Sequence, residues 1–164
     1  MNAIRLAGLA LALAVTASAG QAKPKPKEIV PAQIVEYYKK FNTGDPSYAD
    51  LLADDVEFPH ITAGLLKGKA EVVGFYKKLK HNGLQEERVP QTIVIDNKGG
   101  LAAVELLVKM WTDPGVEHQL PTGETIKPGE IWEGTNVLFY KIRDGKIVQI
   151  RGSRSGPGKM QKVK

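Results

Sequence analysis

The spacing of apolar residues changes once along this chain, at residues 81–83, and that change constrains the fold more than any other feature. Upstream, apolar residues recur every three to four positions over 31–41 and 69–80, which is typical of helices with one buried face. Downstream, apolar and polar residues alternate with a period of two, which is typical of strands, over 89–96, 101–112, 130–142 and 147–154. Helices followed by antiparallel strands predict an α+β fold in which the helices pack on one face of a curved sheet.

The segments between these elements carry weaker signals. A short helical piece is expected over 48–52 and a strand over 55–61, followed by a loop that contains Gly64 and Gly68. Pro90 predicts that its strand begins at an edge or a bulge, because proline has no N–H for a central ladder. The Pro- and Gly-rich segment 113–129 predicts an extended loop or an irregular hairpin. Beyond Ser155 the chain is polar and basic and is expected to fray.

The first 22 residues carry the features of a secretory signal peptide. A positive charge at Arg5 precedes an apolar run over 6–15, which is too short to span a bilayer. Small residues at Ala17 and Ala19 predict cleavage after Ala19, with Ala22 as the alternative. We therefore expect an exported protein, secreted or periplasmic, without a stable membrane anchor after cleavage.

Charge is distributed unevenly in this chain of 164 residues with a net charge of +5. Seven of its 23 Lys and Arg residues lie before Glu28 or after Gly158, whereas all 18 acidic residues lie from Glu28 to Gly158. A basic, Pro-rich lead-in over 23–29 and a basic, flexible tail over 156–164 therefore flank one domain over 30–155. Because the terminal basic residues have no aromatic neighbours, we expect no binding of nucleic acid.

Several kinds of chemistry have no residues to support them. The chain has no cysteine, which excludes disulfides, thiol catalysis and most structural zinc sites. Its three histidines are far apart in sequence and form no metal-binding motif. A phosphate-binding loop, a dinucleotide-binding glycine motif and a Gly-x-Ser-x-Gly motif are also absent. We therefore expect neither a metal ion nor a cofactor.

The order of elements and four short motifs resemble the SnoaL-like and ketosteroid isomerase-like branch of the nuclear transport factor 2-like superfamily. The motifs are the helix over 34–41 closed by Asn-Thr-Gly-Asp, the segment LLADDVEF at 51–58, Gly-Lys-Ala-Glu with an aromatic pair over 68–76, and Asp-Gly-Lys-Ile at 144–147. The resemblance spans residues 30–154. It implies a cone-shaped sheet packed against N-terminal helices (a cystatin-like roll), an apolar pocket between them, and dimers formed through the sheet.

The catalytic residues that the resemblance implies are only partly present. An oxyanion-binding tyrosine is expected on the first helix, where Tyr37 stands. The general base of ketosteroid isomerases falls at Phe58 and their second oxyanion acid falls near Leu138, and neither side chain can transfer a proton. Polyketide cyclases of this type often carry an acid in the last strand, but residues 148–152 contain none.

Polar side chains on the expected pocket faces are the remaining candidates. His60 shares a strand face with Phe58 and is either a pocket residue or a histidine on the rim. Asn136 lies among apolar residues and needs a hydrogen bond, from a ligand or from neighbours. Arg154 ends the last strand, where it either binds a carboxylate or phosphate or is solvated. The predicted apolar lining of the pocket is Phe58, Trp132, Leu138, Tyr140 and Ile150.

Three functions stay open on the sequence. The first is an exported domain that binds a small apolar ligand, with Tyr37, His60 and Asn136 as its polar contacts. The second is an isomerase, cyclase or dehydratase in which His60 acts as base while Tyr37 and Asn136 stabilise an enolate. The third is an interaction module whose outer sheet face, around Leu107 and Trp111, contacts a protein partner or forms a homodimer.

Overall fold

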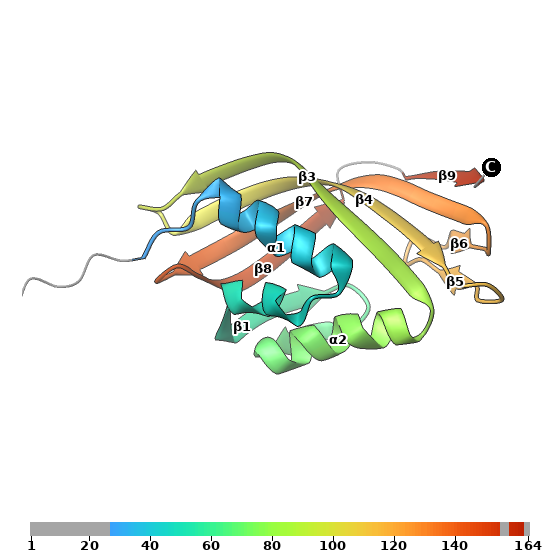
Figure 1. Cartoon of the computed structure of the whole chain (residues 1–164), viewed down its shortest axis with the longest axis horizontal. Helices are drawn as coiled ribbons and strands as arrows, with labels where there is room; N and C mark the ends of the chain where they lie inside the picture. The colour runs from blue at the N-terminus through green and yellow to red at the C-terminus, as the bar shows by residue number, and fades with distance from the viewer. Residues whose placement is uncertain (1–26, 155–157, 163–164) are drawn as a thin grey trace, which may run out of the picture.

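The computed structural model describes residues 27–154 and 158–162, without the side chains of residues 153 and 154. The predicted signal peptide and most of the lead-in lie outside the described residues. Two helices, α1 (Pro31–Thr43) and α2 (Lys69–His81), lie on one side of a long sheet, together with the short 3-10 helix η1 (Pro46–Leu51) (Figure 1). The predicted α+β architecture is confirmed.

The large sheet has the strand order β2–β1–β8–β7–β4–β3. Its strands are β1 (Leu52–His60), β2 (Gly64–Lys67), β3 (Leu84–Asp96), β4 (Leu101–Thr112), β7 (Glu130–Arg143) and β8 (Lys146–Arg154). One more strand, β9 (Lys159–Lys162), pairs with the first residues of β7. The strands β5 (His118–Gln119) and β6 (Thr125–Ile126) form a separate small hairpin within the Pro- and Gly-rich segment.

One pair of strands departs from the expected antiparallel sheet. β1 and β8 run parallel, with Glu57 paired to Gln149, and the connection between them along the chain, which includes α2 and three long strands, is long enough to allow this. The other pairs of the large sheet are antiparallel. The sheet is therefore mixed.

The two helices form where the sequence predicts them. Pro31 stands in the first turn of α1, and Gly44 ends the helix in the left-handed region at φ +76°, where glycine has no steric penalty. The buried residues of α1 are Ile34, Tyr37, Tyr38 and Phe41. No helix in the described ranges is long and apolar enough to cross a bilayer.

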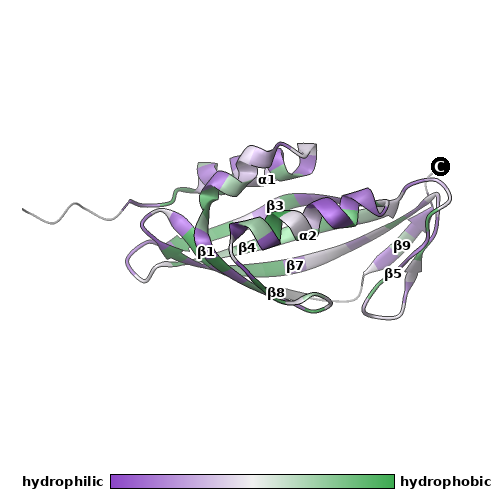
Figure 2. Ribbon diagram, turned by 90° about the horizontal axis from the view of Figure 1, so that it is seen from below, coloured by the Kyte–Doolittle hydropathy of each residue, from purple (hydrophilic) through white to green (hydrophobic). Residues whose placement is uncertain are grey.

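The core lies between the helices and one face of the sheet, which we call the inner face. Along β4, the inner face carries Ala102, Val104, Leu106 and Val108, all of them buried. Their partners across β7 are Tyr140, Leu138, Asn136 and Gly134. Figure 2 shows the hydrophobic segments of β1, β4, β7 and β8 beneath the helices.

Three elements differ from the sequence prediction. β3 begins at Leu84 rather than at residue 89, so Glu86 and Arg88 belong to a strand. The expected loop at Gly64 is the strand β2, which forms a hairpin with β1. Residues 159–162 of the tail, expected to fray, form β9, because Trp132 packs against Gly158 and gives the tail an apolar support.

The prediction about Pro90 is confirmed. β3 is the last strand of the sheet order, and its register with β4 shifts between Pro90 and Thr92, as at a β-bulge. A second register shift, between Lys141 and Ile142 on β7, lets both Ile147 and Ile150 of β8 be buried.

Candidate functional site

The inner face holds most of the residues that the sequence nominated. Phe58, Trp132, Leu138, Tyr140 and Ile150 are all buried there or at its margin. Tyr140 pairs with Ile150 and Leu138 pairs with Gly152, which places these residues in two neighbouring rows across β7 and β8. Arg154 pairs with Asn136 through the backbone, but its side chain lies outside the described part of the structure.

His60 stands at the end of β1, where the strand turns towards β2. Its ring is 4.5 Å from the ring of Phe75 and 5.3 Å from that of Phe58, measured between centroids. Burial lowers the pKa of His60 below its usual range near 6.5, and the positive charge of Arg88 lowers it further. His60 is therefore neutral at pH 7.

The hydrogen bonds of His60 indicate which nitrogen carries the proton. The backbone N–H of Thr62 donates to Nδ1 over 3.3 Å, so Nδ1 is the unprotonated nitrogen. The proton of the neutral ring is then on Nε2, which can donate a hydrogen bond but cannot accept a proton. This arrangement favours His60 as a hydrogen-bond donor to a ligand over His60 as a general base.

Gly152 is exposed and has no side chain. Among the described residues, a Cβ atom built on Gly152 would meet one heavy atom outside its chain neighbours within 4 Å, the Cδ2 atom of Leu138 at 3.0 Å. His60 lies three residues beyond Glu57 on β1, and Gly152 lies three residues beyond its partner Gln149 on the parallel strand β8. His60, Gly152 and Leu138 therefore face the same side of the sheet, and we call this part of the inner face the Gly152 region.

Asn136 lies next to the Gly152 region, two residues before Leu138 on the same face of β7. Its Oδ1 atom is buried and has no hydrogen-bond partner within the described ranges. Burying an acceptor without a donor lowers the stability of the folded chain by about 1–3 kcal/mol. The Asn136 oxygen is therefore an acceptor that a ligand could satisfy. The sequence nominated Asn136 because it interrupts an otherwise apolar strand face.

Tyr37 is a buried residue of α1. Its buried ring packs edge-on against Tyr38 and Tyr48, and burial raises the pKa of its hydroxyl well above 10. No hydrogen bond or ring contact joins Tyr37, His60 and Asn136 to one another among the described residues. The tyrosine that reaches the sheet is Tyr38, whose hydroxyl is hydrogen-bonded to that of Tyr140.

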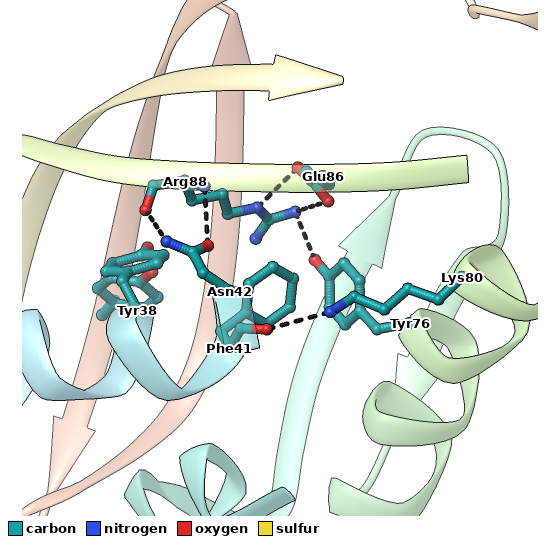
Figure 3. A network of polar contacts seen from close by, with 8 residues as sticks. Tyr38, Phe41, Asn42, Tyr76, Lys80, Glu86 and Arg88 are labelled. Atoms are coloured by element: carbon teal, nitrogen blue, oxygen red, sulfur yellow. Dashed lines mark hydrogen bonds and ion pairs between the residues drawn. The ribbon is translucent and has the colours of Figure 1, made fainter. Parts of the chain in front are cut away.

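A polar cluster that the sequence did not nominate lies between α1, α2 and β3 (Figure 3). The Arg88 guanidinium donates to both carboxylate oxygens of Glu86, from Nε over 2.7 Å and from Nη2 over 3.1 Å. Nη2 also donates to the Tyr76 hydroxyl over 3.0 Å. The guanidinium stacks on the rings of Phe41 and Tyr76, 4.7 and 4.9 Å from their centroids. We call these four residues the Arg88 cluster.

Two facts connect the Arg88 cluster to the inner face. Arg88 pairs with Val108 and Glu86 pairs with Met110, so both charged side chains point to the same side of the sheet as the core. Each side chain is 12% exposed. Opposite charges two residues apart lie on the same face of a strand, so this pair is predictable once the strand begins at Leu84.

Asn42 attaches α1 to the edge of the sheet beside this cluster. Its side-chain amide donates to the Arg88 carbonyl and accepts from the Arg88 N–H, each over 2.9 Å, as a neighbouring strand would. The Asn97 side-chain amide likewise donates to the carbonyl of Ile29 and accepts from its N–H, and Ile29 is completely buried. These two amides satisfy backbone groups that the sheet leaves unpaired.

The surface of the described residues has hollows, and the two that are best formed are lined by neither Asn136 nor His60. One, of about 410 Å³, lies between α1, η1 and the turn from β7 to β8, with Tyr37, Tyr48, Lys40 and Lys146 in its lining. The other, of about 50 Å³, lies between the end of α1 and α2. In the part of the chain that the structure covers, no group of three or more His, Asp or Glu residues is placed to hold a metal ion.

The outer face of the sheet carries exposed apolar residues. Val94, Ala103 and Phe139 form one row across β3, β4 and β7, and the side chains of Val94 and Phe139 are 62% and 52% exposed. Trp111 lies on this face as predicted and is 36% exposed. Leu107, the other residue nominated there, is half-buried between Val89 and Thr135.

Comparisons with known proteins support the fold. The chain is similar to a candidate polyketide cyclase from Pseudomonas putida, at 24% identity and a TM-score of 0.59, over 74% of this chain and 87% of that one. It is similar to an NTF2-like protein of unknown function from Burkholderia pseudomallei, at 16% identity and a TM-score of 0.57, over 76% and 88% of the two chains.

An LEH-like epoxide hydrolase from Mycobacterium tuberculosis is also similar, at 11% identity and a TM-score of 0.56, over 76% of this chain and 84% of that one. No family model and no curated protein matches the sequence. The chain therefore has the α+β fold of SnoaL-like and nuclear transport factor 2-like proteins. This agrees with the resemblance found in the sequence, and proteins of this fold differ in activity.

Proposed function

We propose that this protein binds a small, mainly apolar molecule on the inner face of its sheet, at the Gly152 region. The buried, unpartnered Oδ1 atom of Asn136 is the observation that carries the proposal. A ligand hydroxyl or N–H that donates to this oxygen would remove the cost of leaving it unpaired. Leu138 and Phe58 supply apolar surface nearby, and Nε2 of His60 supplies a donor at the margin.

The test uses tetralin and α-tetralol, two probes of nearly equal size that differ by a hydroxyl group. We expect α-tetralol to raise the melting temperature of the protein more than tetralin does, because ligands that bind the native state stabilise it. In an Asn136→Leu variant this difference should disappear, while the variant without probe is at least as stable as the original protein. If neither probe raises the melting temperature of the original protein, the proposal is wrong.

Thr112 provides the matched control. Its Oγ1 atom is also buried without a partner in the described ranges, and its side chain lies on the same face of the sheet, at the far end of β4. A Thr112→Val variant should keep the full response to α-tetralol. Loss of the response in both variants would show that general loosening of the core, rather than the Asn136 oxygen, explains the result.

A second candidate function is supported by the outer face. We propose that a second copy of the chain covers the row of Val94, Ala103 and Phe139, because exposed apolar side chains in one continuous row mark association surfaces. Sedimentation equilibrium should give twice the chain mass for the original protein and the chain mass for Phe139→Glu. A single-chain mass for the original protein at all concentrations would contradict this proposal.

An enzyme of the isomerase, cyclase or dehydratase kind stays a hypothesis. The hydrogen bond from Thr62 to Nδ1 of His60 speaks against His60 as its base, and no described contact joins Tyr37 to Asn136. Export likewise stays a prediction that rests on the leader sequence, since residues 1–26 are not described. The expected cleavage after Ala19 or Ala22 lies upstream of Ile29, which is part of the folded core.

A further inference from the structure

The hairpin of β1 and β2 ends in an exposed apolar turn. Ile61 is 83% exposed, more than any other large apolar side chain among the described residues, and Leu65 is 50% exposed. The three residues between them are exposed as well, and we call residues 61–65 the hairpin tip. The sequence over 58–66 contains no Asp, Glu, Lys or Arg. An uncharged projection with two exposed large apolar side chains marks a surface that contacts something other than water.

The helix α2 brings positive charge to the hairpin tip. The Lys69 ammonium lies 2.8 Å from a carboxylate oxygen of Asp54, so the first residue of α2 stands beside the early part of β1. The ring centroid of Phe75 lies 4.5 Å from that of His60, the last residue of β1. α2 therefore runs along β1 towards the hairpin tip. Lys78 follows Phe75 by one turn on the same side of the helix, so this exposed lysine lies beside the tip.

The charge of this edge of the molecule is opposite to that of the rest. Residues 58–83, which include the end of β1, β2 and α2, carry five lysines and one glutamate, whereas the other residues from 28 to 158 carry 11 basic and 17 acidic side chains. Lys77 and Lys78 are exposed and form no ion pair among the described residues. Because β2 ends the sheet order on this side, the hairpin and α2 form a positively charged edge (Figure 1).

We propose that the hairpin tip inserts into the surface of an anionic lipid bilayer, with Lys78 beside the lipid headgroups. Apolar insertion and positive charge together give reversible binding at a membrane surface, where either feature alone is marginal. A bilayer suits this narrow projection because lipids adapt to its shape, whereas a stable protein interface needs roughly 800 Å² of complementary surface on each partner. The contact lies outside the inner face of the sheet, so it does not depend on the small ligand proposed there.

A fluorescent label on the hairpin tip tests insertion directly, because the chain has no cysteine of its own. The mature protein from Lys23 contains every described residue and lacks the apolar leader. With bimane on Ala63→Cys, vesicles of phosphatidylcholine and phosphatidylglycerol should shift the emission to shorter wavelength, and nitroxide-labelled lipid should quench it. Bimane on Lys98→Cys, in the turn at the end of the sheet where β1 begins, should show neither effect. Vesicle binding without any change at position 63 would overturn the proposal, because the basic ends of the chain would then account for it.

Vesicle sedimentation with unlabelled variants measures the two contributions separately. Ile61→Ser should weaken binding about tenfold, because an isoleucine side chain no longer leaves water. Lys78→Glu should also weaken binding about tenfold, whereas Lys98→Glu, with the same change in net charge, should change it by less than about twofold. These side chains are exposed, so the melting temperatures should stay unchanged. Equal binding of the original protein and Ile61→Ser, or no binding to either, would overturn the proposal and favour a protein partner for the hairpin tip.

Discussion

Replacing Arg88 with alanine is expected to lower the free energy of unfolding by about 3–5 kcal/mol, because one partner of a largely buried ion pair is removed. Glu86 would keep its charge at a site where its side chain is 12% exposed, without its two hydrogen bonds. The rings of Phe41 and Tyr76 would also lose the guanidinium stacked on them. Urea unfolding of both proteins measures the difference.

Two controls separate burial from charge. The double variant Glu86→Leu with Arg88→Met removes both charges and should recover most of the lost stability, because no buried charge is left alone. Arg143→Ala breaks the ion pair with Asp55, whose side chains are 59% and 64% exposed, and should change the stability little. Equal losses for Arg88→Ala and Arg143→Ala would contradict the buried position of the Arg88 cluster.

Replacing Trp132 with alanine is expected to cost about 3–5 kcal/mol of stability, as is typical of large aromatic residues in a core. Trp132 is completely buried. Cβ atoms built on Gly134 and Gly158 would lie 2.3 and 2.0 Å from its ring, so the indole fills the space between these two glycines. Gly158 directly precedes β9 and packs against the indole ring. Without the ring, this end of β9 loses its apolar contact with the core.

The other tryptophan is the control for this prediction. Trp111 lies on the outer face and is 36% exposed, so Trp111→Ala removes less buried surface and should cost much less. Measurements at low protein concentration avoid any contribution from association through the outer face. A loss for Trp132→Ala as small as that for Trp111→Ala would show that the indole is not enclosed between the two glycines.

The sequence predicts this fold best where burial and periodicity agree. The alternation of apolar and polar residues along β4 and β7 is enough to identify the inner face and to place Asn136, Leu138 and Tyr140 on it. The same alternation does not reveal where β3 begins, because Glu86 and Arg88 are charged. A charged pair in a possible strand suggests a solvent-exposed segment instead. Whether such a pair is buried depends on residues far away in sequence, here Phe41 and Tyr76.

The site is predictable only in part for the same reason. His60 and Asn136 follow from the faces of their own strands, which is local information. The apolar stripe of the first helix indicates Tyr37, but adjacent tyrosines on α1 cannot be told apart in this way, and Tyr38 is the one that reaches Tyr140. The tail strand β9 has no local signal, because Gly158 and Trp132 meet across 26 positions of sequence.

Periodicity predicts the α+β class, the order of helices and long strands, and the inner face of the sheet, because each depends on the pattern of a few neighbouring residues. Composition alone excludes thiol chemistry, because the chain has no cysteine. Long-range packing is needed to bring Glu86 and Arg88 together beneath the helices, to leave the Asn136 oxygen unused and to join the tail to the sheet. These three features arise from contacts between distant segments, where the whole fold sets the environment of each polar group.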